Sequence, residues 1–215
     1  MTLQQTVSYI WLQQAFLAIF FVWFFDMSIF ESIENGSVAY ELVRPINLYN
    51  KWFVSSAANR VARAALRCMP MLLVALLLPH PFRLVLPRDV LQLTLFFASM
   101  LLTLGVVVGF SMLIYISSFH TLSSMGTRIV IGVTGDFLAG GYIPLPFFPD
   151  NLRRIVELSP FGAMMNTPLL IFSGYLTGEA LVRGLSVQVF WLVVLVCVGK
   201  LLMGNAIRRV VVQGG

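Results

Sequence analysis

Charged residues are scarce in this chain, since lysine, arginine, aspartate and glutamate together make up 11% of its 215 residues. Soluble domains carry about 25% of such residues. Apolar residues account for 59%, so the sequence has too little charge to cover the surface of a water-soluble fold. The composition therefore predicts an integral membrane protein.

Motifs for common chemistries are also missing. The sequence has no GxxxxGK[ST] phosphate loop and no HExxH, CxxC or GxSxG, which excludes ATP binding through a phosphate loop. His80 and His120 have no acid or cysteine beside them in sequence, so we expect interfacial residues and not metal ligands. We predict no catalytic residue, no metal site and no cofactor site in this chain, which is therefore not expected to be an enzyme.

Cysteine is nearly absent and basic residues are dispersed. Cys68 and Cys197 lie in or beside apolar runs far apart in sequence, which favours small buried side chains over a disulfide.

The net charge of +5 comes from basic residues spread between apolar runs. Because they do not form one face, we expect no nucleic-acid partner and attribute their placement to membrane orientation.

Five stretches are apolar enough to be predicted as membrane-spanning helices, each of which needs about 20 mostly apolar residues. They are residues 9–26, 64–79, 90–119, 129–146 and 185–203. Asp89 is predicted to cap the third span, and Pro70 to kink the second. Gly105 and Gly109 have the GxxxG spacing that lets another helix approach closely.

The polar interval 31–63 contains the most distinctive segment, from Gly36 to Pro45. Ser37 is predicted to cap a short helix there, which Pro45 ends. One face of that helix is apolar through Val38 and Leu42, and Ile46 falls on the same face across the break. Such a helix suits a membrane surface or a partner's groove, and an ordinary interfacial helix without a partner is the alternative.

Two further features lie in the second half of the chain. Asp136 sits within the glycine-rich fourth span, where an acid is a functional candidate. The alternative is that Asp136 bonds a neighbouring helix or faces a water-filled vestibule. Residues 149–174 are interrupted by prolines and contain only a dozen apolar residues in a row, which predicts a broken re-entrant hairpin.

Basic residues predict the orientation of the chain. If the interval 31–63 is cytoplasmic, nine basic residues lie on its side and five on the other. The nine are Arg44, Lys51, Arg60, Arg63, Arg67, Arg128, Lys200, Arg208 and Arg209, and the five are Arg83, Arg88, Arg153, Arg154 and Arg183. This balance predicts an outside N-terminus and an inside C-terminus.

Three patches, in the same order along the chain, resemble the permease subunits of ABC-2-type transporters, in the bacterial branch related to antibiotic and drug exporters. The segment Ile33–Ile46 is similar to the family's cytoplasmic pattern I-x-x-G-x-x-A-x-x-L-x-R-P. The second patch comprises Pro144, Pro146, Phe148-Pro149, Leu158-Ser159-Pro160-Phe161 and Pro168. The third is the terminal Val-Val-Gln-Gly-Gly.

The resemblance implies an all-α, type V exporter-like permease with about five transmembrane helices, a cytoplasmic coupling helix and an external re-entrant hairpin. Family members usually have six spans, so a first helix is expected to be missing here. A second permease subunit would complete the translocation path in the bacterial inner membrane. A cytoplasmic ATP-binding cassette subunit, which itself holds ATP and Mg²⁺, would dock on the coupling helix.

The resemblance also assigns candidate sites by position. The coupling helix would use Gly36, Tyr40, Glu41, Arg44 and Pro45, and the outer gate Pro149, Pro160, Phe161 and Pro168. Asp136 is the candidate for the translocation path. The expected function is export of hydrophobic or amphipathic compounds. The alternatives are a stand-alone channel or secondary transporter that uses Asp136, and a membrane scaffold for a soluble partner.

Overall fold

The computed structural model describes residues 1–87, 89–121 and 124–208, and these residues form helices without any strand. In chain order the first helices are α1 (Leu3–Ala15), α2 (Leu17–Phe20), α3 (Met27–Glu34), α4 (Val38–Leu42), α5 (Leu48–Leu77) and α6 (Val90–Ser117). They are followed by α7 (Ser124–Leu138), η1 (Leu145–Phe147), α8 (Asp150–Leu158), α9 (Pro160–Met164), α10 (Asn166–Phe172) and α11 (Gly178–Ile207). Arg88, Arg209 and the terminal Val-Val-Gln-Gly-Gly lie outside the described residues.

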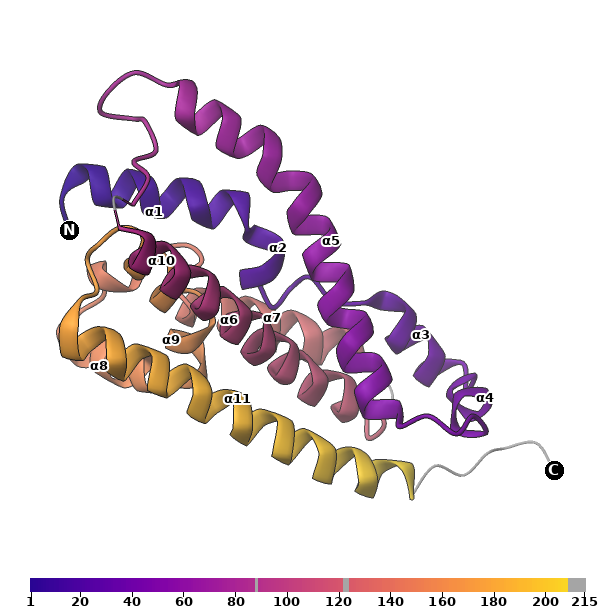
Figure 1. Cartoon of the computed structure of the whole chain (residues 1–215). Coiled ribbons are helices and arrows are strands. Elements are labelled where there is room, and N and C mark those ends of the chain that lie inside the picture. The colour runs from indigo at the N-terminus through magenta and orange to yellow at the C-terminus, as the bar shows by residue number, and fades with distance from the viewer. Residues whose placement is uncertain (88, 122–123, 209–215) are drawn as a thin grey trace.

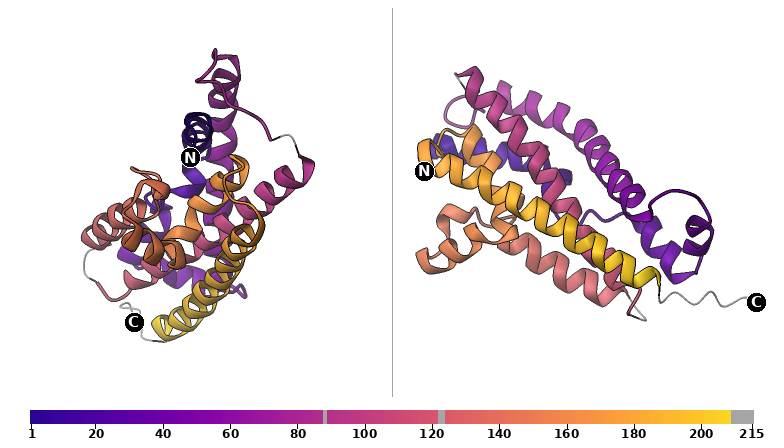
Figure 2. Two further views of the ribbon diagram at one scale, coloured as in Figure 1. Left: turned by 90° about the vertical axis from the view of Figure 1, so that its left-hand side faces the viewer. Right: turned by 60° about the horizontal axis from the view of Figure 1, so that its bottom comes forward.

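The molecule is elongated and has two distinct ends (Figure 1, Figure 2). One end holds the N-terminus together with α8 and the start of α11. The other end holds α3, α4 and the end of α11. The passage α1–α3 and helices α5, α6, α7 and α11 run between them. The short helix α4 and the short helices α8 to α10 therefore lie at opposite ends.

Helices α6 and α11 form the most extensive helix pair, and the two glycines of the GxxxG motif lie in their contact. A Cβ atom added to Gly105 would lie 2.7 Å from Leu192 Cδ1, and one added to Gly109 would lie 3.2 Å from Leu195 Cβ. The missing side chains let the two helices approach closely. The partner of the predicted motif is thus a helix of the same chain.

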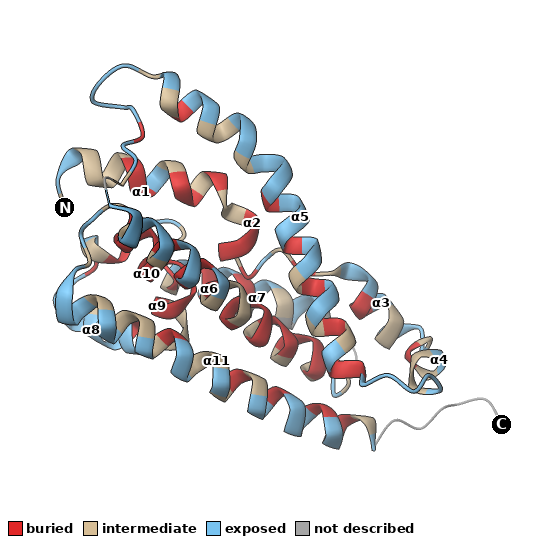
Figure 3. Ribbon diagram, in the orientation of Figure 1, coloured by how far each residue is buried: buried red, intermediate tan, exposed pale blue. Residues whose placement is uncertain are grey.

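Two helices of the described part, α6 and α11, are long and apolar enough to cross a membrane by length and composition. Although α11 is strongly apolar, most of its residues face outward, as Figure 3 shows. Leu201 is 70% exposed and Phe190 is 58% exposed. Such a surface is favourable against lipid and costly against water.

The second predicted span belongs to a longer helix than the sequence indicated. Helix α5 begins at Leu48, where Asn47 caps it by accepting a hydrogen bond from the Asn50 amide. The predicted boundary near residue 64 falls inside it, because no proline or glycine interrupts the residues before Pro70. Pro70 itself lies within the helix and does not end it.

The first predicted span, residues 9–26, is broken. Helix α1 ends at Ala15, α2 is a single turn, and the chain is extended at Phe21 before Asp26 caps α3. The fourth span also ends early, because α7 stops at Leu138 and Gly140 adopts a φ of 89°. The third span agrees with its prediction, including the Asp89 cap, whose carboxylate accepts from the Leu91 amide.

Residues 149–174 form the three short helices α8, α9 and α10, so the predicted interruptions are present. Side chains of the long helices bond the ends of these short ones. Trp191 Nε1 of α11 donates to the Leu158 carbonyl at 2.8 Å. Gln92 Nε2 of α6 donates to the carbonyls of Ile171 and Phe172 at 2.8 and 3.0 Å. These bonds satisfy carbonyls that have no partner within the short helix.

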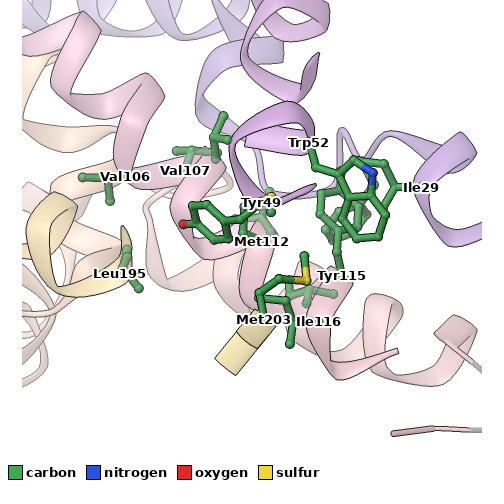
Figure 4. Close-up of a cluster of buried hydrophobic side chains, with 14 of the residues drawn as sticks. Ile29, Tyr49, Trp52, Val106, Val107, Met112, Tyr115, Ile116, Leu195 and Met203 are labelled. Carbon is green, nitrogen blue, oxygen red and sulfur yellow. The ribbon is translucent and has the colours of Figure 1, made fainter. Parts of the chain in front are cut away.

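The core nearest α4 is a cluster of aromatic and aliphatic side chains that joins four helices (Figure 4). Tyr49 and Trp52 of α5 pack in one buried cluster with Ile29 of α3, Tyr115 of α6 and Met203 of α11. The base of α4 rests on this cluster through buried Val38.

We predict that Gly109→Leu destabilises the protein by about 1–3 kcal/mol, the usual cost of overpacking a close contact. The measurement is thermal unfolding in detergent. Gly204→Leu in α11 is the control, because no atom lies within 4 Å of a Cβ added there. Equal melting temperatures for the two variants would contradict the α6–α11 contact described above.

Candidate functional site

The turn between α3 and α4 is fixed by its local sequence. Gly36 adopts a φ of 75°, in the left-handed region that favours glycine. The Asn35 side-chain oxygen accepts a hydrogen bond from the Ser37 amide at 2.9 Å. Ser37 stands at the N-cap position of α4, as predicted, but its side chain makes no cap bond, and Asn35 stabilises the turn that precedes the helix.

Glu41 attaches α4 to the start of α5. Its Oε2 atom accepts a hydrogen bond from Trp52 Nε1 at 2.9 Å and lies 2.9 Å from Lys51 Nζ. The Glu41 side chain is 26% exposed. The Glu41 carboxylate is thus engaged within the chain, and the exposed side chains here are Tyr40 of α4 and the residues that follow the helix.

The α4 surface consists of Tyr40, Val43, Arg44, Pro45 and Ile46, all of which are exposed. Tyr40 is 80% exposed and Val43 is 85% exposed. Ile46 was expected on the same face as Val38, but Val38 is buried whereas Ile46 is 56% exposed. The reason is that α4 ends at Leu42, so Ile46 lies beyond the helix and does not follow its periodicity.

Arg60 is a buried cation that the sequence did not single out, and its side chain is among the largest fully buried ones. Its Nη1 atom donates to the carbonyls of Ala18 and Phe21 at 3.0 and 2.7 Å. Its Nη2 atom donates to the Val22 carbonyl at 3.3 Å and to Ser111 Oγ at 3.0 Å. The guanidinium therefore satisfies the carbonyls that the end of α2 leaves without helical partners.

Asp136 is buried on the other side of the same segment. Its Oδ1 atom accepts a hydrogen bond from the Val22 amide at 2.7 Å, and Oδ2 accepts one from the Trp23 amide at 3.4 Å. The carboxylate thus bonds the backbone of the non-helical stretch between α2 and α3.

Arg60 and Asp136 carry opposite charges and bond one short stretch of backbone, the guanidinium through carbonyls and the carboxylate through amides. Among the described residues no ion pair joins them directly. Burying a charge is expensive unless it is hydrogen-bonded and compensated. The break in the first span supplies those hydrogen bonds to both side chains.

The predicted gate residues lie in the short helices at the opposite end from α4. Pro149 precedes α8, Pro160 begins α9, and Pro168 is buried within α10. Phe161 packs edge-to-face on Phe110 of α6, with ring centroids 5.4 Å apart. The structure therefore places the predicted residues around α4 apart from the other two groups, whereas Phe161 of the predicted gate lies beside Gly135, the neighbour of Asp136, at 3.6 Å from a Cβ added there.

Gln188 of α11 organises the gate region and was missed by sequence analysis. It is fully buried, its Oε1 accepts from Ser99 Oγ at 2.8 Å, and its Nε2 donates to Thr103 Oγ1 at 2.8 Å and to the Ala163 carbonyl at 3.0 Å. Two features of the sequence could have indicated this contact. Gln188 is a lone amide in an apolar run, and Ser99 and Thr103 are hydroxyls one helical turn apart on α6.

A cavity of about 360 Å³ lies beside the start of α11. Its lining includes Asn166 and Thr167 of α10 with Glu179 and Arg183 of α11. Neither Asp136 nor any of the four predicted gate residues lines it. Within the described part of the chain, no group of three or more histidine, cysteine, aspartate or glutamate residues is suited to a metal ion.

Comparison with known proteins identifies the family. A family model described as ABC-2 family transporter protein matches residues 2–214. No curated protein and no solved structure matches the chain. The match to the family model covers nearly the whole sequence, and the chain therefore belongs to the ABC-2 family of transporter proteins.

Proposed function

We propose that this chain is the membrane-spanning subunit of an ATP-driven exporter of hydrophobic or amphipathic compounds in the bacterial inner membrane. The ABC-2 family consists of transporter membrane subunits, which are generally non-catalytic and associate with an ATP-binding subunit. In this proposal the partner subunit holds ATP and Mg²⁺. A second permease subunit, identical or different, completes the path.

The observation that carries the proposal is the position of α4. It lies at one end of the molecule, away from α8–α10, with the α4 surface exposed (Figure 1). That surface holds a tyrosine and an arginine, which are residue types enriched in the energetic centre of protein interfaces, beside the exposed apolar side chains of Val43 and Ile46. We assign it as the docking surface of the ATP-binding subunit.

The mechanism follows from how α4 is attached. Closure of the ATP-binding subunits displaces α4, and the Glu41 contacts with Lys51 and Trp52 pass the displacement to the first turn of α5. Export then requires two arrangements of the spans, of which the ATP-bound partner favours one. At the other end, the short helices that carry Pro149, Pro160, Phe161 and Pro168 act as the outer gate.

We infer the orientation in the membrane from the basic residues, which favour the cytoplasmic side. Arg44 is exposed on the α4 surface, and Lys51, which is half-buried and paired with Glu41, follows in the first turn of α5. Arg60 does not contribute to this balance, because it is buried and hydrogen-bonded. The proposal places the α4 end in the cytoplasm and the outer gate on the other side.

The decisive experiment is an affinity purification of the full chain in mild detergent, followed by identification of what accompanies it. The proposal expects an ATP-binding cassette protein in stoichiometric amount. Recovery of the chain alone, in a form that moves ions or solute in vesicles without ATP, would instead favour a stand-alone carrier in which Asp136 acts in transport. An inert chain with another soluble partner would favour a scaffold.

We predict that Arg44→Glu lowers the amount of co-purified ATP-binding subunit by about tenfold or more, because an arginine at an interface centre contributes about 2 kcal/mol or more. Thermal stability should stay unchanged, since the side chain is exposed. Arg154→Glu is the matched control, because Arg154 is an exposed arginine of α8 at the other end. Equal loss in both variants would argue against docking on α4.

We also predict that Glu41→Ala weakens co-purification more than Lys51→Ala does, because the first removes both contacts that position α4 and the second leaves the bond to Trp52. The double variant should then be little weaker than Glu41→Ala alone, as expected when the residues belong to one interaction. The measurement is titration of the ATP-binding subunit onto each variant in detergent. If Glu41 instead contacts the partner directly, Lys51→Ala will leave the affinity unchanged.

A further inference from the structure

The break in the first passage is a meeting point of the long helices. We define the joint segment as residues 21–26, between α2 and α3. It contains neither proline nor glycine, so its local sequence does not require a break. Its backbone groups are bonded by side chains from α5, α6 and α7.

Helix α5 holds both ends of the joint segment through two consecutive residues. Arg60 bonds the carbonyls of Phe21 and Val22 at the beginning of the segment. Asn59 Nδ2 donates to Asp26 Oδ2 at 2.7 Å at its end. Any displacement of α5 along its axis therefore pulls on the segment at two places.

Helices α6 and α7 hold the segment from other sides. The Asp26 amide donates to the Tyr115 hydroxyl of α6 at 2.7 Å. Asp136 of α7 bonds the amides of Val22 and Trp23. Glycines bring α7 close enough for this contact, since a Cβ added to Gly132 would lie 3.2 Å from the Trp23 ring.

A segment held in this way moves differently from a continuous helix. A helix is stiff because each turn is bonded to the next, whereas the joint segment owes these contacts to side chains of other helices. Its φ and ψ angles change without breaking a helical ladder. The Arg60 fork has five N–H donors, so a small shift lets it exchange one carbonyl for another.

We propose that the joint segment is the link through which displacement of α3–α4 reaches α7, with Arg60 and Asp136 as its positioning residues. The inference rests on the proposed function, because it takes α4 as the docking site of the ATP-binding subunit. It adds a route: α4 and α3 move with α5, Arg60 and Asn59 carry the joint segment along, and Asp136 transmits the shift to α7.

The test is hydrogen exchange of the full chain in complex with the ATP-binding subunit recovered by affinity purification, in nanodiscs of phosphatidylethanolamine and phosphatidylglycerol. Exchange is compared with and without ATP and orthovanadate. In the unmodified chain we expect an ATP-dependent change both in residues 27–42 and in residues 129–141. Arg60→Gln should preserve the first change and reduce the second by about fivefold or more, within the usual range of coupling between sites.

Two further variants keep the test informative. Arg63→Gln removes the same charge from an exposed position one turn along α5 and should behave like the unmodified chain. Asn59→Ala breaks the exposed contact with Asp26 without leaving a buried charge, and it serves if Arg60→Gln does not fold. We expect Asn59→Ala to reduce the response of residues 129–141 in the same direction.

The outcomes separate the inference from the proposed function. If residues 27–42 do not respond to ATP in the unmodified chain, docking on α4 is wrong and the inference falls with it. If they respond while residues 129–141 do not, or if folded Arg60→Gln or Asn59→Ala keeps the full response, the inference alone is overturned. A purely stabilising role of Arg60 would raise exchange equally with and without ATP and leave the difference intact.

Discussion

A backbone amide or carbonyl that is buried away from water must find a hydrogen-bond partner, and in a membrane this constraint is at its strictest. The structure meets it in two places where helices are interrupted. Arg60 and Asp136 bond the break in the first passage. Gln92 and Trp191 bond the ends of the short helices α10 and α8. In both places polar side chains of long, continuous helices complete the interrupted ones.

The same constraint explains why two charges are tolerated in the interior. A buried arginine alone, or a buried aspartate alone, would be strongly destabilising. Here the guanidinium faces carbonyls, the carboxylate faces amides, and the two charges flank one stretch of backbone. Removing either side chain leaves the charge of the other without compensation, and it also leaves buried backbone groups without a hydrogen-bond partner. The break and the two side chains therefore depend on one another.

Sequence patterns predicted the parts of the fold whose causes are local. The Asp89 cap and the proline-separated helices beginning at Pro149 and Pro160 each follow from adjacent residues. The break in the first passage was not predictable in this way, because residues 9–26 contain no proline or glycine. Its cause lies in Arg60 and in Asp136, which is more than a hundred residues away in the chain.

The same distinction between local sequence and long-range packing applies to the candidate sites. Exposure of the α4 surface depends on a short helix that ends before Pro45, and that much follows from the local sequence. The inward role of Glu41 does not, because it depends on where α5 begins and on which of its residues face α4. The bonds of the Glu41 carboxylate to Lys51 and Trp52 are a feature of the packing that the charge pattern of residues 31–63 does not indicate.

The two ends of the molecule are built differently. The α4 end rests on a buried cluster of aromatic and aliphatic side chains shared by α3, α5, α6 and α11. The other end consists of short helices joined at Pro149 and Pro160, which leave more backbone outside long helical ladders. In the proposed function, displacement of α4 is passed on through the long helix α5, which begins at the α4 end. The break at residues 21–26, which α5, α6 and α7 all contact, lies between the α4 end and the end that holds α8–α10.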